Sequence, residues 1–258
     1  MTPVALTIAG SDPSGGAGLQ ADLKTFHRFE IYGEAVVTLI TVQNTRGVTR
    51  VDPLTADLVA EQIRAVLEDI APHAAKTGAL GSKEVVSAVA DAAAAFKFPL
   101  VVDPVMTGKH GARFLDDDSV RVLIERLIPR AFLLTPNLDE AAALAGLAVN
   151  ARESMIRAAK KLIGLGAANV LVKGGHLPGD ALDILYTGAG EIHEFTAARV
   201  ATPHTHGSGC TYSAAITAEL ARGTPVVEAV RRAKDFVTRA ILTNPGLGGG
   251  QGPLNHHA

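Results

Sequence analysis

The sequence is short of the features that mark secreted, membrane-bound and nucleic-acid-binding proteins. Its 258 residues include one cysteine, Cys210, which cannot form an internal disulfide and therefore predicts a reducing, cytoplasmic setting. No apolar run approaches the roughly 18 to 20 residues that cross a bilayer. The first basic residue is Lys24, so the N-terminus lacks the basic region of a signal peptide. With 24 basic and 26 acidic residues, the chain offers no broad surface for nucleic acid or an anionic membrane.

The remaining composition is typical of a folded protein. Hydrophobic residues make up 47% of the chain and charged residues 19%, which is ordinary globular usage and excludes disorder as the main state. No linker, internal repeat or low-complexity spacer divides the sequence. We therefore expect residues 1–258 to form one domain, whose core needs neither disulfides nor a structural metal. The glycine-rich tail from Asn244 onward suggests only flexibility.

Short β-branched runs alternate with longer segments of helical period, which predicts an α/β fold: a mostly parallel central sheet with helices on both faces. Strands are expected at residues 4–9, 35–42, 100–103, 132–134 and 170–173, and helices at 19–29, 55–70, 82–96, 117–128, 139–145, 152–165, 209–222 and 226–242. Residues 181–186 and 192–195 predict a small antiparallel hairpin in the C-terminal third. The run at 35–42 is continuously apolar, which is typical of a strand covered on both faces.

The unusual polar and glycine-rich segments all follow predicted strands. These segments are residues 10–18, 43–44, 76–81, 103–108, 135–140 and 173–176. Ligands of an open parallel sheet bind beyond the carboxyl ends of its strands. The shared location of the segments therefore predicts that several of them form one site.

The strongest local pattern is His204-Thr205-His206-Gly207-Ser208-Gly209-Cys210, which opens an alanine-rich helix. Two glycines allow a tight turn, so that successive N–H groups and the helix dipole converge on one point. Such a point binds an anion, or the charge that develops on a transferring phosphoryl group. An ordinary glycine-rich helix start is the alternative.

The loop Gly10 to Gly18 is a second candidate for ligand binding. It is not a Walker A motif, because the Gly-Lys-Ser/Thr ending is absent. It also lacks the G-x-G-x-x-G spacing of a dinucleotide site. The loop either cradles an anion or lets a small ligand approach the backbone closely.

Cys210 stands at the predicted helix start, where the positive end of the dipole is expected to lower the pKa of the thiol. Three roles remain open for it. It is a buried and inert thiol, a covalent nucleophile with His204 or His206 as its base, or a base for a substrate hydroxyl. The covalent role ranks third, because a hydrolase needs no lysine, carboxylates and second glycine loop around its cysteine.

Oxygen-bearing side chains and one lysine follow the later strands. Asp103, Asn137 and Glu140 are of the type that holds Mg²⁺ on nucleotide phosphates, partly through water. As alternatives, Asp103 and Asn137 are turn and cap residues. Lys173 ends an apolar strand just before Gly174, where it reaches into the site as a point charge for phosphate or runs out to the surface.

Several of these motifs closely resemble the hydroxymethylpyrimidine/phosphomethylpyrimidine kinases of thiamine biosynthesis, a family of the ribokinase-like superfamily. The resemblance covers nearly the whole chain, tail included. Its segments are Ala5–Gly18 (ALTIAGSDPSGGAG), Gln20–Thr25, Val102–Met106, Thr135–Asn137 with Glu140 and Ala141, Val172–His176, and His204–Cys210.

The resemblance implies a ribokinase-like fold and an ATP-dependent kinase. Such an enzyme phosphorylates the hydroxymethyl group of 4-amino-5-hydroxymethyl-2-methylpyrimidine and then phosphorylates the monophosphate. It implies ATP and Mg²⁺ as cofactors, a small-molecule substrate, no nucleic-acid or membrane partner, and a cytoplasmic homodimer.

The resemblance also assigns roles to individual residues. Cys210 and Lys173 are the catalytic pair, with Cys210 as the base. The backbone N–H groups of the anion hole come from Gly207, Ser208, Gly209 and Cys210. ATP and Mg²⁺ are assigned to Asp103, Asn137, Glu140 and Lys173, with Asp103 and Glu140 nearest the metal. The pyrimidine is assigned to Gln43 and to the backbone of Gly10 and Val105.

Two positions depart from the family pattern. Ala79 stands where methionine is expected, which predicts a roomier substrate pocket. Ser208 stands where threonine is commoner, a small change because its backbone N–H is the group in use. A roomier pocket keeps a pyridoxal or pyridoxine kinase open as an alternative. A catalytically inactive pyrimidine-binding protein is a third alternative, against which Lys173, Glu140 and Cys210 together argue.

Overall fold

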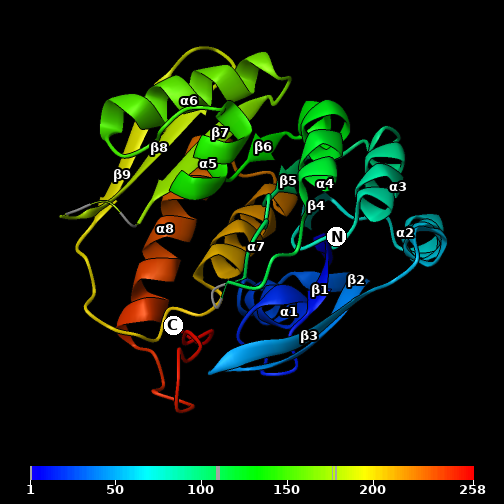
Figure 1. The fold of residues 1–258 in the computed structure, drawn as a ribbon, viewed down its shortest axis with the longest axis horizontal. Helices are drawn as coiled ribbons and strands as arrows, with labels where there is room; N and C mark the ends of the chain where they lie inside the picture. Colours follow the sequence, from blue (N-terminus) through cyan, green and yellow to red (C-terminus); the bar gives the residue numbers. More distant parts are fainter. Residues whose placement is uncertain (1, 109–110, 176, 178) are drawn as a thin grey trace.

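The computed structural model describes residues 2–108, 111–175, 177 and 179–258, and within them one sheet of nine strands runs through the molecule (Figure 1). The strands are β1 (Val4–Ser11), β2 (Tyr32–Asn44), β3 (Gly47–Pro53), β4 (Ala74–Thr77), β5 (Leu100–Val102), β6 (Leu133–Leu134), β7 (Asn169–Gly174), β8 (Ala181–Thr187) and β9 (Ile192–Ala197). Their order across the sheet is β3-β2-β1-β4-β5-β6-β7-β8-β9. Neighbours from β2 to β7 are parallel, while β3, β8 and β9 pair antiparallel.

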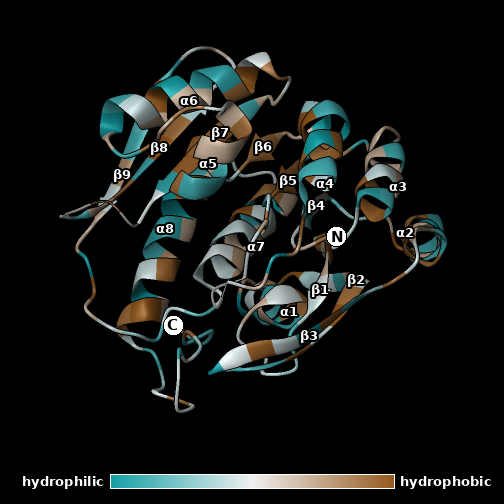
Figure 2. Ribbon diagram, viewed as in Figure 1, coloured by the Kyte–Doolittle hydropathy of each residue, from teal (hydrophilic) through white to brown (hydrophobic). Residues whose placement is uncertain are grey.

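Helices cover both faces of this sheet. They are α1 (Gly18–Arg28), α2 (Ala56–Asp69), α3 (Lys83–Ala93), α4 (Asp117–Val122), α5 (Leu138–Ala145), α6 (Arg152–Gly164), α7 (Ser208–Ala221) and α8 (Val226–Leu242). One buried apolar cluster joins the sheet to α2, α3, α5 and α6, and the other joins it to α1, α7 and α8. Figure 2 shows the apolar strands between helices whose outer faces are hydrophilic. The predicted α/β class and the hairpin of β8 and β9 are confirmed.

One predicted helix is interrupted. The segment expected at 117–128 is α4 followed by a π-helical turn, Leu123–Leu127, and a 3₁₀ turn, Ile128–Arg130. Pro129 lies in the last turn and has no backbone N–H to donate, so the α-helical ladder cannot continue through it.

The prediction that residues 35–42 are covered on both faces is wrong at the C-terminal end of the run. Ile40 and Val42 are 49% and 53% exposed. The pairing explains this exposure: β1 ends at Ser11, opposite Ile40, and beyond that point β2 pairs with β3 alone. The end of β2 is therefore a two-stranded ribbon that leaves the body of the sheet.

Two strands were not expected from the sequence, because neither has an apolar β-branched run. The segment that forms β3 is polar and lies at the edge of the sheet. The segment that forms β4 reads Ala-Ala-Lys-Thr, yet all four residues are buried. Lys76 therefore lies inside a strand and not in the polar loop that was predicted to begin there.

The glycine-rich tail is packed against the domain, so the expectation of flexibility is wrong. Leu254 is 2% exposed and belongs to the apolar cluster of α7 and α8. The amide of His206 donates to the carbonyl of Gly252 over 3.1 Å. A Cβ atom at Gly252 would clash with His204, so this glycine serves close approach of the backbone. Among the described residues no helix has the length and apolar character of a membrane span.

Candidate active site

The two glycine-rich segments singled out in the sequence lie against each other. Gly10 is buried in β1, which extends to Ser11, so the first loop is shorter than predicted and comprises residues 12–17. Gly207 has a φ of 79°, and a Cβ atom there would clash with the carbonyl oxygen of Gly16. Only glycine allows this left-handed turn and this approach. The first loop and the start of α7 are therefore in direct contact and make up one candidate site.

The start of α7 is left open by the protein. The amide of Ser208 donates to the carbonyl of Thr205 over 3.3 Å, and no side chain caps the helix. Within the described part of the chain, the amides of Gly209 and Cys210 have no acceptor. Unpaired first-turn amides and the positive end of the helix dipole favour an anion here.

Asp12 and His206 join the first loop to the segment before α7. The Nε2 atom of His206 lies 2.8 Å from Oδ2 of Asp12, and both side chains are buried. The same carboxylate accepts from the amides of Gly16 and Ala17 over 3.2 and 2.8 Å. Burial alone would raise the pKa of Asp12, but hydrogen bonds from His206 and Ser14 outweigh it and lower the pKa to about 2. The sequence analysis did not predict that Asp12 and His206 join these two segments. The available signal was a carboxylate within a glycine-rich loop.

Lys173 and Asp103 form a buried ion pair beside the start of α7. The Nζ atom lies 2.8 Å from Oδ1, and the two side chains are 13% and 2% exposed. A Cβ atom at Gly209 would lie 3.4 Å from Nζ of Lys173. The hydroxyls of Thr135 and Ser213 donate to Asp103 over 3.2 Å each. The alternative of a surface lysine is therefore wrong, and Lys173 and Asp103 are brought to the predicted anion hole.

Burial and charge act in opposite directions on this pair. Burial raises the pKa of Asp103, but Lys173 and Lys76 outweigh it, so the pKa lies below its ordinary value. Burial lowers the pKa of Lys173, but Asp103 and Glu140 outweigh it and the pKa is raised. Both groups are therefore charged at neutral pH.

Asn137 and Glu140 cap α5 reciprocally. The amide of Glu140 donates to Oδ1 of Asn137, and the amide of Asn137 donates to Oε2 of Glu140, each over 2.9 Å. The alternative interpretation of Asn137 as a cap residue is therefore confirmed. Asn137 also pairs with Lys173 in an isolated parallel bridge. Burial raises the pKa of Glu140 to about 7, with Lys173 lowering it and Asp103 raising it.

The expectation of a lowered pKa at Cys210 is wrong. Burial raises the pKa of its thiol to about 11, although Lys76 and the backbone N–H of Gly18 both act to lower it. Removal of the thiolate from water outweighs these two contributions and the favourable position at the helix start. Cys210 is therefore a neutral thiol at neutral pH in the unliganded protein.

A second buried ion pair lies behind Cys210, and sequence reasoning missed it. Lys76 and Asp22 are both fully buried, with Nζ 2.8 Å from Oδ2. The hydroxyl of Thr7 donates to the same oxygen over 2.6 Å, while Oδ1 of Asp22 has no partner among the described residues. Lys76 acts electrostatically on Cys210. The only available signal was a lysine that follows two alanines.

The residues assigned to the pyrimidine share fewer contacts than those around Lys173 and Asp103. Gln43 is half-buried at the end of β2, in the part that pairs only with β3. The amide of Val105 donates to the carbonyl of Asp103 over 2.9 Å. The carbonyl of Ala79 accepts from Thr38 over 2.6 Å. No hydrogen bond within the described ranges joins Gln43 to Gly10 or Val105, so their grouping stays a prediction. His176, the last residue of one resemblance segment, lies outside the described residues.

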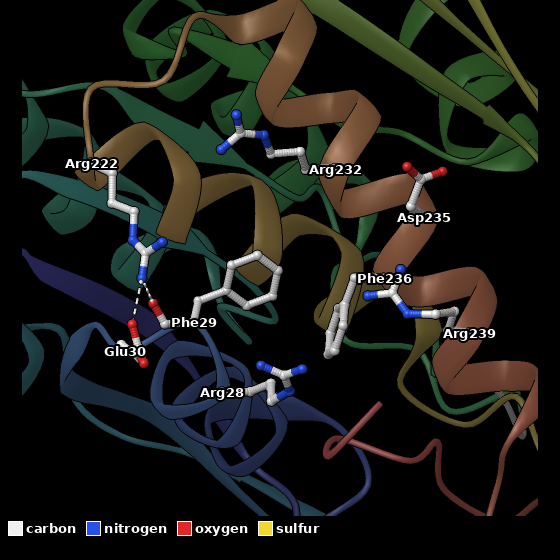
Figure 3. A pocket seen from close by; sticks show the side chains of 8 residues that line it. All are labelled: Arg28, Phe29, Glu30, Arg222, Arg232, Asp235, Phe236 and Arg239. Atoms are coloured by element: carbon white, nitrogen blue, oxygen red, sulfur yellow. Dashed lines mark hydrogen bonds and ion pairs between the residues drawn. The ribbon is translucent and has the colours of Figure 1, made fainter.

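A cavity of about 350 Å³ lies away from these residues (Figure 3). It is lined by four arginines, two phenylalanines and two acids: Arg28, Arg222, Arg232, Arg239, Phe29, Phe236, Glu30 and Asp235. It lies where α1 and α7 end, whereas the candidate site lies where they begin. Three of its guanidinium groups already donate to protein oxygens, those of Ala258, Phe29 and Glu219. This cavity is therefore distinct from the candidate site.

The sequence is similar to characterised kinases over nearly its full length. The family model for phosphomethylpyrimidine kinase matches residues 12–255. The hydroxymethylpyrimidine/phosphomethylpyrimidine kinase of Bacillus subtilis is 44% identical over 257 residues, covering 98% of this chain and 94% of that protein. The thiamine biosynthesis bifunctional protein ThiED of Geobacter sulfurreducens is 48% identical over 253 residues. That match covers 97% of this chain but 51% of the longer protein.

Solved structures of two related kinases share the fold. A Bacillus subtilis pyridoxal kinase in complex with ADP has a TM-score of 0.92 and 39% identity, covering 100% of this chain and 98% of the other. The phosphomethylpyrimidine kinase of Clostridium difficile has a TM-score of 0.82 and 42% identity, covering 93% and 100%. Family model, sequence relatives and fold agree. The chain therefore belongs to the phosphomethylpyrimidine kinase family.

Proposed function

We propose that the protein is an ATP-dependent kinase of thiamine biosynthesis, which phosphorylates 4-amino-5-hydroxymethyl-2-methylpyrimidine and then its monophosphate. The observation that carries this proposal is the placement of the Lys173–Asp103 pair beside Gly209, at the uncapped start of α7. Phosphoryl transfer depends on positioning and on donors aimed at developing negative charge. The names of the relatives support the choice of substrate.

The chain's own groups supply the electrostatics of the transfer. The backbone N–H groups of residues 207–210 are assigned to the transferred phosphoryl group, as donors that need no reorganisation during the reaction. Lys173 contributes a charged ammonium that Asp103 holds in place. Asp103 is itself held by Thr135 and Ser213, so the ammonium has a fixed position.

The donor set fits Mg²⁺ as a cofactor held mainly by the nucleotide. No group of three or more metal-ligating side chains occurs in the part of the chain that is described, but Mg²⁺ commonly takes one or two carboxylates together with phosphates and water. Burial raises the pKa of Glu140 to about 7, and the nearby carboxylate of Asp103 also acts to raise it. A cation offsets this crowding of carboxylates. When bound, Mg²⁺ neutralises phosphate charge. Asn137 is assigned to the same region, where it fixes the orientation of Glu140.

Cys210 is assigned as the base of the first phosphorylation. The hydroxymethyl oxygen is a weak nucleophile until its proton is removed, and we assign the removal of that proton to the thiolate of Cys210. Lys76 and the Gly18 amide favour the thiolate, while burial opposes it. In the second phosphorylation an ionised phosphate oxygen attacks, so that step needs no base.

The pyrimidine is assigned to the region between β2 and the loop after β5. Gln43 supplies an amide that matches the donor and acceptor of an aminopyrimidine edge. Gly10 and Val105 supply backbone groups. Ala79 leaves more space than the methionine usual in the family.

The test is product identification by mass spectrometry after incubation with Mg-ATP and the pyrimidine alcohol. The proposal predicts the monophosphate first and the diphosphate second, each with one ADP per phosphoryl group. ADP formed without a phosphorylated pyrimidine contradicts it. A bound pyrimidine that raises the melting temperature without any turnover supports an inactive binding protein instead.

Pyridoxal kinase activity is the second candidate, favoured by one observation. The pyridoxal kinase of Bacillus subtilis matches this fold with a TM-score of 0.92. Pyridoxal also carries a hydroxymethyl group on a heteroaromatic ring. Comparison of both substrates in one assay decides between the two activities.

We further infer a cytoplasmic homodimer that acts as one kinase domain over residues 1–258. The single cysteine supports the reducing compartment. Ile40 and Val42 lie two positions apart on β2, and therefore on one face of the strand, and are 49% and 53% exposed. Neighbouring exposed apolar groups commonly mark an interface between proteins. Size-exclusion chromatography with light scattering tests the oligomeric state.

A further inference from the structure

We propose that residues 250–256, here called the C-terminal strap, are a positioning element of the active site. The strap holds the start of α7, the first loop and the β2–β3 turn at fixed distances from one another. The inference rests on the proposed function, which assigns the phosphoryl group to the start of α7 and the pyrimidine to Gly10 and Gln43, which lie two residues before the first loop and the β2–β3 turn. Figure 1 shows the C-terminal segment in red, between the end of α8 and the β2–β3 ribbon.

The strap pairs with the segment just before the anion hole. The amide of His206 donates to the carbonyl of Gly252, and the amide of Gly252 donates to Nδ1 of His204, each over 3.1 Å. His206 and Pro253 form an isolated parallel bridge. Gly207 follows His206 directly, so these contacts fix the entry into α7.

A second contact reaches the first turn of α7. Nε2 of His256 lies 3.2 Å from the hydroxyl oxygen of Thr211, and the two residues are 7% and 0% exposed. Thr211 follows Cys210 in the chain. The strap therefore holds α7 on both sides of the predicted base and anion hole.

The strap also touches the two segments that follow Gly10 and Gln43, the residues assigned to the pyrimidine. A Cβ atom at Gly16 in the first loop would lie 2.6 Å from His206 and 3.2 Å from Pro253, so these three residues are in tight contact. In the β2–β3 turn, the carbonyl of Thr45 accepts from the amide of Gln251 over 2.8 Å. Thr45 lies two residues beyond Gln43.

Rigid elements anchor the strap. Leu254 is buried against α7 and α8, and the amide of Asn255 donates to the carbonyl of Ala240 in α8 over 3.0 Å. No hydrogen bond or ion pair described in the structure joins the strap to Lys173, Asp103, Asn137 or Glu140. The strap therefore acts on the pyrimidine side and on the anion hole, and not on the groups assigned to the nucleotide.

Two variants with matched controls test this selectivity. Gly252→Ala forces Cβ against His204, and its control is Gly249→Ala, whose Cβ meets only the end of the Arg46 side chain. His256→Asn removes the contact to Thr211, and its control is His257→Asn at the exposed neighbouring position.

The strap variants are expected to raise KM for the pyrimidine and lower kcat, each by about tenfold, because misplacement by about 1 Å costs that much or more. The dissociation constant of ADP, measured by calorimetry, is expected to stay within about twofold of the wild-type value, as is every constant of the two controls. A merely structural role would lower the melting temperature and leave the ratio of the pyrimidine KM to the ADP dissociation constant unchanged. Equal changes in pyrimidine KM and ADP affinity, or no change in either, overturn the proposal.

Thiol labelling gives a readout that does not depend on turnover. Cys210 is the chain's only cysteine, so alkylation by iodoacetamide reports on the start of α7 alone. The strap variants are expected to label about fivefold faster or more, because local opening at the start of α7 exposes more of the half-buried thiol. Labelling at the wild-type rate in both variants contradicts the proposal. If wild-type protein does not phosphorylate the pyrimidine, the proposed function fails, whereas the labelling result still decides whether the strap fixes α7.

Discussion

The ammonium group of Lys173 lies 2.8 Å from the carboxylate of Asp103, at the point where α7 begins. The two residues are 70 positions apart in the chain; Lys173 lies in β7, and Asp103 directly follows β5. Hydroxyls of Thr135 and Ser213 hold the carboxylate from two further elements. The arrangement fixes one positive charge beside the amides of the predicted anion hole.

Removal of that charge is expected to abolish most of the activity. Lys173→Met should lower kcat by roughly 100-fold or more, because one preorganised donor to developing charge is commonly worth that much. Steady-state ADP production measures the effect, with the melting temperature recorded to separate folding from catalysis. The control is Lys97→Met at an exposed position. A Lys173→Met enzyme that folds and retains kcat near wild type contradicts the assigned role.

Replacement of Cys210 is expected to separate the two phosphorylations. Cys210→Ala should impair phosphorylation of the alcohol by about 100-fold or more, in the range of general base catalysis, and leave the monophosphate step nearly unchanged. Each step is measured with its own substrate under single-turnover conditions. Equal losses in both steps would show that Cys210 supports the site without acting as a base.

The two steps are also expected to differ in their pH dependence. Because burial raises the pKa of the Cys210 thiol to about 11, the thiolate fraction at lower pH increases about tenfold per pH unit. The first step should therefore accelerate from pH 7 to pH 9. The second step should be nearly flat over the same interval, since a phosphate monoester is already ionised there. Parallel profiles would exclude a base of this pKa.

Loss of one partner of the buried Lys76–Asp22 pair is expected to destabilise the fold strongly. Lys76→Met leaves the Asp22 carboxylate buried without its ammonium, which costs about 3–5 kcal/mol. Equilibrium unfolding in urea measures the change. Lys83→Met, which removes an exposed pair with a separation of 3.9 Å, should change the free energy by at most about 1 kcal/mol. Similar losses in the two variants would contradict this account.

Asp12 is expected to contribute to the loss of stability in acid. Its pKa is about 2 in the folded protein, below the ordinary 3.8. A lowered carboxyl pKa stabilises the fold above the ordinary value, and the contribution disappears as the pH falls from about 4 to about 2. The shift corresponds to about 2 kcal/mol. Urea unfolding between pH 5 and pH 2 should show a shallower decline for Asp12→Asn than for wild type, and equal slopes would refute the assignment.

The sequence was most informative where chemistry and topology agree. Polar residues after buried strands were expected to meet at one edge of the sheet, and Asp103 and Lys173 do meet there, beside Gly209 of α7. The reason is general: carboxyl ends of parallel strands share an edge. Lys173 in an apolar strand was recognisable because a charged side chain needs a partner in such a place.

The sequence was less informative where tertiary packing decides. The pKa of Cys210 depends on burial that no local pattern reports, and burial outweighed the helix dipole. Asn137 forms a cap, which its spacing to Glu140 allowed but did not require. Lys76 and the glycine-rich tail were misread for one reason: their partners, Asp22 and His206, lie far away in the chain, and only the fold brings them together.

The most direct test of the central claim is the ratio of kcat/KM for the pyrimidine alcohol to that for pyridoxal, measured as Mg-ATP-dependent ADP production in one preparation. A pyrimidine kinase predicts a ratio of about 100 or more, since a site built to hydrogen-bond one substrate rejects a poorly matched one at least this strongly. It also predicts turnover of the pyrimidine monophosphate. A ratio below one, with no turnover of the monophosphate, would contradict the account and identify a pyridoxal kinase.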